Sequence, residues 1–204
     1  MSSESPTRSR LIALGDERRA MREGYAFLDE KCLLLAAEML AELQRHAALK
    51  AACDSARHAA QRCLAACLQR HGLDGLSVYP ALPEGGIEVD ISRSSLLGVA
   101  LRRVALRTNS ASPAAKAAPA VFPSPEAEAC RSAFSELATA AARLSAVVGN
   151  LLRLHHEYRR TVRRACAIHD VVLPELEHDL TDIDSRLDEM EREEALWNRY
   201  SRRR

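Results

Sequence analysis

The stretch "LIALGDERRAMREGYAFLDEKCLLLAAEM", residues 11–39, decides the fold class of this chain. Its seam positions advance alternately by three and four residues, the heptad spacing of a helix that packs against another helix. These positions are Leu11, Leu14, Arg18, Met21, Tyr25, Leu28, Cys32, Leu35 and Met39. We therefore expect a coiled-coil helix in this part of the chain.

The same helix is expected to continue well beyond residue 39. After Met39 we place the next seam positions at Leu43 and His46, and then the apolar face broadens into alanines as far as Leu68. The pattern stops at "HGLDG", residues 71–75. A helix over 9–71 would be about 95 Å long at its usual rise per residue, far longer than an ordinary globular helix.

A second long helix is predicted to begin at Ser124-Pro125, because a serine cap followed by proline suits a helix start. It passes Phe134, Leu137, Leu144, Val148 and Leu152. Its later seam is Val162, Ala165, His169, Val172, Leu176, Leu180, Ile183, Leu187, Met190 and Trp197.

The later seam departs from the heptad around Pro174. Between Val172 and Leu180 the steps are four plus four, a departure that unwinds a supercoil. Proline inside a helix removes a hydrogen bond and clashes with the preceding turn. We therefore expect a kink or a local straightening at Pro174.

The middle of the chain has a different pattern. "GIEVDIS" (86–92) and "LGVALRRV" (97–104) are predicted strands, with Gly85-Gly86 as a turn signal. The segment 108–123 is a linker rich in Pro, Ala and Ser. The sequence thus divides into an N-terminal helix (1–76), a β-hairpin with linker (77–123) and a C-terminal helix (124–204), an all-α dominated fold in which a small hairpin interrupts a long antiparallel two-helix coiled coil.

Charge supports the antiparallel pairing, which would place residues near 18 beside residues near 190. The stretch 175–194 holds ten acidic residues and two arginines. Opposite it we expect Arg18, Arg19 and Arg22, since flanking charges select partner and orientation. Two independently solvated helix faces are the alternative reading.

Composition excludes several classes of function. The chain has 204 residues, 4% aromatic residues and a formal net charge of +1, so no global field selects nucleic acid or membrane. We find no signal peptide and no apolar run long enough to span a bilayer, and we expect a cytoplasmic protein. Its six cysteines, Cys32, Cys53, Cys63, Cys67, Cys130 and Cys166, are read as free thiols.

Clusters of reactive side chains point to packing rather than chemistry. Cys63, Cys67 and His71 share a helix stripe and could ligate zinc, but a fourth ligand is missing and core packing is the better reading. His155-His156-Glu157 and His169-Asp170 lack a nucleophile or a phosphate loop. The basic turn Arg159, Arg160, Arg163 and Arg164 lacks the interleaved aromatic residues of nucleic-acid binders. We expect no catalytic residues, no cofactor and no metal.

Three stretches resemble the D subunit of the V-type and A-type rotary ATPases. "PTRSRLIALGDERRAMREGYAFLDEKCLLL" (6–35) is similar to the start of that family, and "ISRSSLLGVALRRV" (91–104) to its central Gly-Val segment at Gly98 and Val99. "RRACAIHDVVLPELEHDLTDIDSRLDEMEREE" (163–194) resembles its C-terminal signature, including Pro174 and the Leu-Asp-Glu-Met-Glu-Arg-Glu run. Cys166, Ile168, His169 and Asp170 depart from that signature.

The resemblance implies a central-stalk rotor shaft that is not itself an enzyme. It implies two terminal helices that enter a head of catalytic A and regulatory B subunits, a hairpin side that binds the F subunit at Gly98 and Val99, and a foot on the C (or d) subunit of the membrane rotor. The protein would sit peripherally on the inner face of the membrane and serve ATP synthesis or ATP-driven proton or sodium transport. The rotor-to-head contacts would be Arg8, Arg10, Arg18, Arg22, Glu189 and Arg192, and Pro174 would bend the shaft.

Two other classes stay open from the residues alone. The first is a cytoplasmic coiled-coil scaffold or adaptor without a rotary role. The second is a nucleic-acid-binding coiled coil, which steep salt dependence of DNA binding would reveal.

Overall fold

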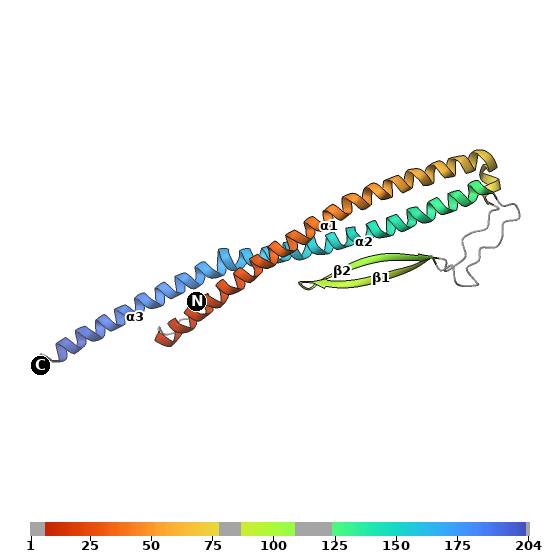
Figure 1. Ribbon diagram of the computed structural model, residues 1–204. Coiled ribbons are helices and arrows are strands. Elements are labelled where there is room, and N and C mark those ends of the chain that lie inside the picture. Colours follow the sequence, from red (N-terminus) through yellow and green to blue (C-terminus); the bar gives the residue numbers. More distant parts are fainter. Residues whose placement is uncertain (1–6, 78–86, 109–123, 203–204) are drawn as a thin grey trace. The chain divides into compact units, whose positions relative to one another are not determined.

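The computed structural model describes residues 7–77, 87–108 and 124–202. Its elements are α1 (Arg8–Ser77), β1 (Ile87–Leu96), β2 (Val99–Thr108), α2 (Pro125–Ala167), a π-helical turn (Ile168–Val172) and α3 (Leu173–Ser201) (Figure 1). The expected fold class is confirmed: long helices at both ends of the chain and a small antiparallel sheet between them. The predicted start of the second helix at Ser124-Pro125 is also confirmed.

The chain forms two compact units, which we describe separately. Unit 1 comprises Met1–Leu35 with Tyr158–Arg204, and unit 2 comprises Ala36–Glu157. Contacts within each unit join the N-terminal helix to the C-terminal helical stretch in antiparallel orientation: Arg22 with Glu177 in unit 1, and His71 with Ser124 in unit 2.

The predicted seam of α1 is confirmed over residues 11–39. Leu14 and Leu35 are buried, and the other seven positions are all half-buried, Arg18 included. By contrast, Ile12, Leu33 and Leu34 beside the seam are exposed. The three-four spacing, and not hydrophobicity alone, therefore selects the side chains that pack.

Beyond Met39 the predicted seam position at Leu43 was wrong, whereas the one at His46 is confirmed. The next core position is Glu42, only 3% exposed, whereas Leu43 is 48% exposed. A step of three from Met39 keeps the heptad, and all of its later positions are buried or half-buried: His46, Leu49, Cys53, Ala56, Ala60, Cys63 and Cys67. Because Glu42 is charged, the sequence did not suggest it as a core position, although the three-four spacing continues through it.

Helix α1 turns sharply near its end. Gly72 has non-helical angles, with φ 66° and ψ 175°, and the helix resumes as far as Ser77. A positive φ costs a residue with a Cβ atom, so glycine suits this position. The turn brings Leu76 against the buried residues Cys67, Ala127 and Cys130.

The seam of α2 also differs from the expected one in its first half. Val148 and Leu152, which the sequence favoured, are exposed, while Val147 and Leu154 are buried. The later positions Ala165 and Leu176 are buried, and Val162, Val172, Leu180, Ile183 and Leu187 are half-buried, as predicted. His169, Met190 and Trp197 are exposed instead.

The π-helical turn explains the departure from the heptad around Pro174. Leu173 donates its N–H to the carbonyl of Ile168, five residues earlier. A π turn accommodates one extra residue in a helix. The seam positions Ile168 and Leu176 are accordingly eight residues apart, one more than a heptad would give. Pro174 follows as the second residue of α3, so the predicted local change in winding lies immediately before the proline.

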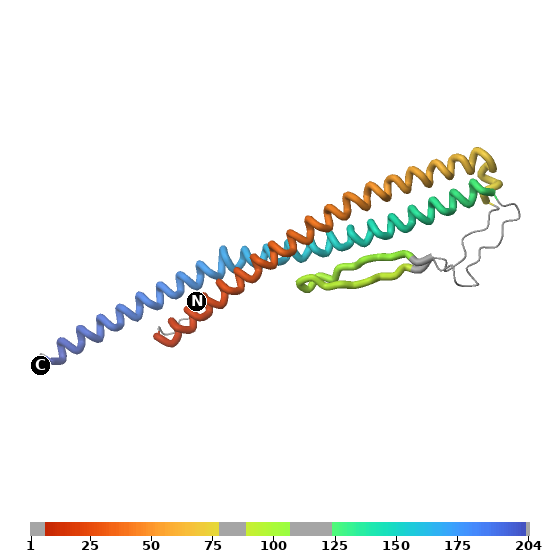
Figure 2. Tube along the Cα trace, viewed as in Figure 1, coloured from red at the N-terminus to blue at the C-terminus, as the bar shows by residue number. Residues whose placement is uncertain are grey.

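The two strands form a tight hairpin, seen as the paired green segments in Figure 2. Both strands are longer than predicted, and they pair from Ile87↔Thr108 to Leu96↔Val99. The turn is Leu97-Gly98, with φ values of 49° and 87°, so the prediction that placed both residues inside the second strand was wrong. Gly85-Gly86 and the linker 109–123 lie outside the described residues.

One stretch within Pro125–Ser201 is long and apolar enough to cross a membrane by length and composition alone. Within the described residues 11% of that stretch is buried, although Val147 and Leu154 of α2 are buried side chains. The expectation that the chain has no apolar run of this length therefore does not hold here.

Candidate functional site

The candidate functional surface of unit 1 begins with two ion pairs between its helices. Arg8 contacts Glu191, and Arg22 contacts Glu177 at 2.7 Å. The two arginines are fourteen residues apart on α1 and the two glutamates fourteen apart on α3, two heptads on each helix. The pairs therefore repeat on one edge of the seam and fix an antiparallel register.

This register corrects one expectation and supports another. Arg18 lies ten residues after Arg8, so it faces residues around 181 and not around 190. The acidic stretch 175–194 does face the arginines of α1, since it supplies both Glu177 and Glu191. Arg19 instead pairs with Asp16 of its own helix.

The remaining predicted contact residues lie on the surface of unit 1. Arg10 and Glu189 are exposed, and Arg18 is half-buried at its seam position. Arg192 is exposed and lies 3.8 Å from Asp188, one turn earlier on α3. Arg8 and Arg22 thus contact α3. Exposed side chains that a partner could reach from outside the helix pair are Arg10, Glu189 and Arg192.

A shallow hollow lies where α1 begins. Arg8 and Glu191 line it with the apolar side chains of Leu187, Met190 and Trp197. Trp197 is 76% exposed and Tyr200 is 73% exposed. Exposed aromatic side chains at a helix end are typical anchors of protein interfaces, whereas the heptad spacing had predicted a seam position for Trp197.

A second group surrounds the π turn. The Tyr25 and His169 rings have centroids 5.3 Å apart, and His169 Nδ1 lies 2.7 Å from Asp170 Oδ1. His169 and Asp170 are two of the residues that depart from the family signature, and a third, Cys166, is exposed. π turns occur frequently at functional sites, so this group marks a second candidate contact surface of unit 1.

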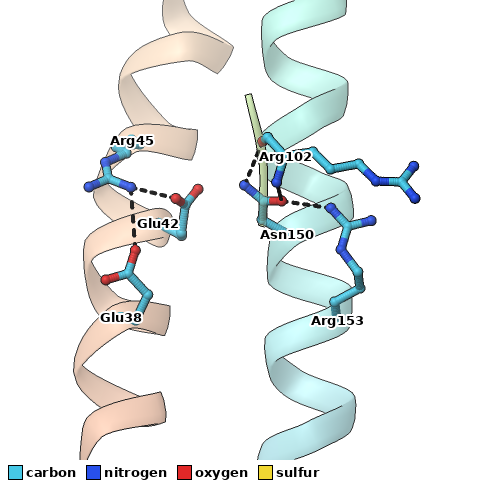
Figure 3. A network of polar contacts seen from close by, with 6 residues as sticks. All are labelled: Glu38, Glu42, Arg45, Arg102, Asn150 and Arg153. Carbon is cyan, nitrogen blue, oxygen red and sulfur yellow. Dashed lines mark hydrogen bonds and ion pairs between the residues drawn. The ribbon is translucent and has the colours of Figure 1, made fainter. Parts of the chain in front are cut away.

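In unit 2 the central feature is the anchor of the hairpin on α2 (Figure 3). Asn150 is 2% exposed. Its Oδ1 accepts the backbone N–H of Arg102 at 2.8 Å, and its Nδ2 donates to the carbonyl of Arg102 at 2.9 Å. The side-chain amide pairs with strand β2 as another strand would, and it satisfies edge groups that β1 leaves unpaired.

Arg153 completes this anchor. Its guanidinium donates to Asn150 Oδ1 at 2.6 Å, so that oxygen accepts two hydrogen bonds. A carbonyl oxygen has two lone pairs, and the amide orientation is thereby determined. Val99 and Leu101 of β2 are buried, with 6% and 9% exposure. They lie on one face of the hairpin, and the side chain of Arg102 lies on the other.

Across the seam, α1 contributes a buried carboxylate (Figure 3). Arg45 contacts both Glu42 and Glu38 from the same helix. Glu42 Oε2 has no hydrogen-bond partner within the described part of the chain. A buried charge is costly unless paired, so Arg45 makes this core position tolerable for glutamate.

The opposite face of the hairpin is open, with apolar side chains toward its base and the exposed pair Arg93 and Arg102 nearer the turn. Val89 and Ile91 are 55% and 44% exposed, and they pair across the ladder with Leu106 and Val104. Gly98 is exposed at the turn, whereas the side chain of Val99 is buried. Of the two predicted hairpin contacts, Gly98 is therefore accessible and Val99 supports the hairpin from inside.

The start of α2 is held by a polar cluster. His71 Nε2 lies 2.7 Å from Ser124 Oγ, and the Ser124 hydroxyl donates to Glu126 at 3.0 Å. A backbone hydrogen bond at the helix start, the Ser124 hydroxyl and, more weakly, Arg70 lower the pKa of Glu126, while desolvation by burial opposes them.

The side chains of the cysteine and histidine stripe of α1 have other contacts in this structure. His71 contacts Ser124, while Cys63 and Cys67 pack near Cys130 of α2. Within the described residues no group of three or more His, Cys, Asp or Glu side chains is arranged to hold a metal ion.

Asn150, Glu42 and Cys130 are the residues that sequence reasoning missed. Each lies on a seam, Glu42 one heptad after Leu35 and Asn150 four residues before Leu154. For Glu42 and Asn150 the available signal was a polar residue at a position where the heptad spacing expects an apolar one. Polar residues occupy such core positions when they have hydrogen-bond partners.

Known proteins of one family are similar to this chain over nearly its whole length. The family model for the ATP synthase D subunit matches residues 10–197. The V-type ATP synthase D subunit of Thermotoga neapolitana is 26% identical over 197 residues, covering 95% of this chain and 94% of that protein. The A-type ATP synthase D subunit of Thermococcus sibiricus is 26% identical over 92% of this chain and 88% of its own length. That of Thermococcus gammatolerans is 32% identical over 52% of this chain and 50% of its own.

Proposed function

This chain belongs to the ATP synthase D subunit family, and from that premise we propose that it is the central-stalk rotor subunit of a V/A-type ATPase. In this role it has no catalytic site of its own. It transmits torque between a head of A and B subunits and the ion-translocating ring in the membrane. The observation that carries the proposal is the match over residues 10–197, which includes both helices of unit 1 and the hairpin of unit 2.

The helix pair of unit 1 suits transmission of torque. Ion pairs two heptads apart and the buried residues Leu14, Ala165 and Leu176 join its two helices. Two joined helices resist torsion better than one, because twisting must shear the contacts between them. Rotation of such an asymmetric element biases each catalytic interface in turn, a rigid-body coupling of distant sites.

We assign the head contacts to the charged surface of unit 1. Arg8, Arg10, Arg18, Arg22, Glu189 and Arg192 are the proposed contact residues. A rotor surface must slide past each of the A and B subunits, and exposed charges give individually weak, screened contacts. The exposed side chains of Trp197 and Tyr200 add an apolar contact at the end of α3.

The hairpin of unit 2 is the proposed side for the F subunit. Gly98 offers accessible backbone at the turn, and the apolar part of the open face, with Val89 and Ile91, offers contact area. The foot on the C (or d) subunit would hold the protein peripherally at the inner face of the membrane through the complex.

Pro174 has a proposed mechanical role. The π turn and the proline change the winding of the C-terminal helix within unit 1, and a bend there would set the shaft off its axis. Replacing Pro174 with Ala is expected to straighten the helix and lower the ATPase-coupled ion transport of the complex. A crystal structure of Pro174→Ala with unchanged helix curvature would exclude this role.

Native mass spectrometry of this chain with its own A, B and F subunits tests the function directly. One copy each of this chain and of the F subunit on a ring of three A and three B subunits is the expected result. A well-folded helical sample that fails to join the ring would return the protein to the scaffold class.

A further inference from the structure

Three thiols from two helices meet in unit 2. Cys67 of α1, 0% exposed, forms a buried cluster with Cys130 and Ala127 of α2, which are 9% and 7% exposed. Cys63 packs against the same cluster from one turn earlier on α1. Cys63 and Cys67 are four residues apart and share a helix face, so Cys130 faces two thiols of the opposite helix.

The thiols differ in their access to solvent. Cys63 is half-buried, while Cys67 and Cys130 are buried, and all three are free in this structure. Burial, with the neighbouring Cys67 and Cys63, raises the pKa of Cys130. A small oxidant would therefore reach Cys63 first, while the raised pKa keeps Cys130 a thiol that does not react with the oxidant directly. Its packing beside Cys63 leaves it in place to attack a mixed disulfide formed there.

We propose that Cys63 and Cys130 form a thiol–disulfide exchange site that links α1 covalently to α2 when a small-molecule disulfide is present. The Cys63 thiolate, after losing its proton to solvent, attacks the disulfide and releases one small thiolate. The Cys130 thiol then gives its proton to the small thiolate released in the first step, and its sulfur attacks the Cys63 sulfur of the mixed disulfide. The Cys63–Cys130 bond forms, the bond between Cys63 and the small group breaks, and the second small thiolate leaves and is protonated by solvent. Two protein thiols are oxidised, and one small disulfide is reduced to two thiols.

This site is independent of the rotor role. It needs only the packing of α1 on α2 within unit 2, and it would close a loop that contains the whole hairpin. Closing a long loop restricts the unfolded chain, so the oxidised protein is expected to melt at a higher temperature than the reduced one.

The test exposes the folded full-length protein to oxidised glutathione and maps the disulfides. After blocking of free thiols, trypsin releases peptide 63–70, which holds Cys63 and Cys67, and peptide 117–131, which holds Cys130. The expected product is these two peptides joined, with fragmentation placing the bond at Cys63. It should form faster as the pH is raised, because the reacting species is the thiolate.

Matched variants separate the proposal from general thiol reactivity. Cys130→Ser is expected to abolish the linked peptide and leave only the glutathione adduct on Cys63. Cys63→Ser should slow linkage strongly, since only the fully buried Cys67 remains on α1. Cys53→Ser, at a half-buried seam position of the same helix, should change nothing.

Circular dichroism of each variant checks that the helices are retained. A Cys63–Cys67 bond without Cys130, a linkage that involves Cys53 instead, or no linkage at all in folded protein that carries the Cys63 adduct would each overturn the proposal.

Discussion

Units 1 and 2 place their polar side chains differently. Unit 1 has exposed ion pairs between α1 and α3, and the side chains of Arg22 and Glu177 remain 56% and 50% exposed. Unit 2 also has an ion pair between its helices, Arg70 with Glu126. In addition it buries polar side chains, with Asn150 and Glu42 at 2% and 3% exposure, and it contains a hairpin and a thiol cluster.

Exposed and buried polar contacts contribute differently to the specificity of the fold. An exposed ion pair sets register but adds little stability, because water and salt screen it. A buried amide that pairs with a strand has one satisfactory geometry, and it is costly to leave unpaired. Unit 1 can therefore present charge to partners, while unit 2 holds a structural element in place.

The largest effect is expected from the apolar seam. Leu154→Ala in unit 2 removes a side chain that is 0% exposed, and we expect the free energy of unfolding to fall by about 2–5 kcal/mol. Urea denaturation measures it. Leu152→Ala, two residues earlier and 66% exposed, is the matched control and should change stability by less than about 0.5 kcal/mol. Equal effects would place the seam at Leu152, as the sequence suggested.

The next largest effect is expected at the hairpin anchor. Asn150→Ala leaves the N–H and C=O of Arg102 without their amide partner, at an expected cost of about 1–3 kcal/mol. Hydrogen exchange should show faster exchange at the Arg102 amide. Asn198→Ala, at an exposed position of α3, is the control. Unchanged protection at Arg102 would mean that other contacts hold the hairpin.

A smaller effect is expected at the ion pairs of unit 1. A double-mutant cycle of Arg22→Ala and Glu177→Ala should give a coupling free energy of at most about 1 kcal/mol. It should decrease as salt is added, because both side chains are exposed. A larger coupling free energy that does not change with salt would mean that this ion pair behaves like a buried polar contact of unit 2, and would contradict the comparison.

The smallest effect is a pH dependence at the start of α2. The pKa of Glu126 is lowered from its usual value of 4.5, so its contribution to stability is present above that value and is lost as the pH falls through the folded-state pKa. Glu126→Gln should flatten the stability profile in this acidic range. Glu128→Gln, which removes a second carboxylate of the same turn, controls for net charge. A profile equally altered by both variants would contradict a specific role for Glu126.

Much of the fold follows from spacing and local chemistry. The seam of α1 over 11–39, the start of α2 at Pro125 and the change in winding before Pro174 were all predictable, because heptads, caps and proline act over a few residues. The hairpin turn was misplaced, because Leu97 adopts a positive φ that its residue type does not favour.

The candidate site was less predictable. The helices, the antiparallel charge pattern and the family resemblance could be predicted, since these depend on residue order along one chain. The burial of Glu42 in place of Leu43, the contact of Asn150 with β2 and the meeting of Cys130 with Cys63 and Cys67 became visible in the folded chain alone. Burial of a polar group depends on its partner, and here each partner lies on another turn, strand or helix.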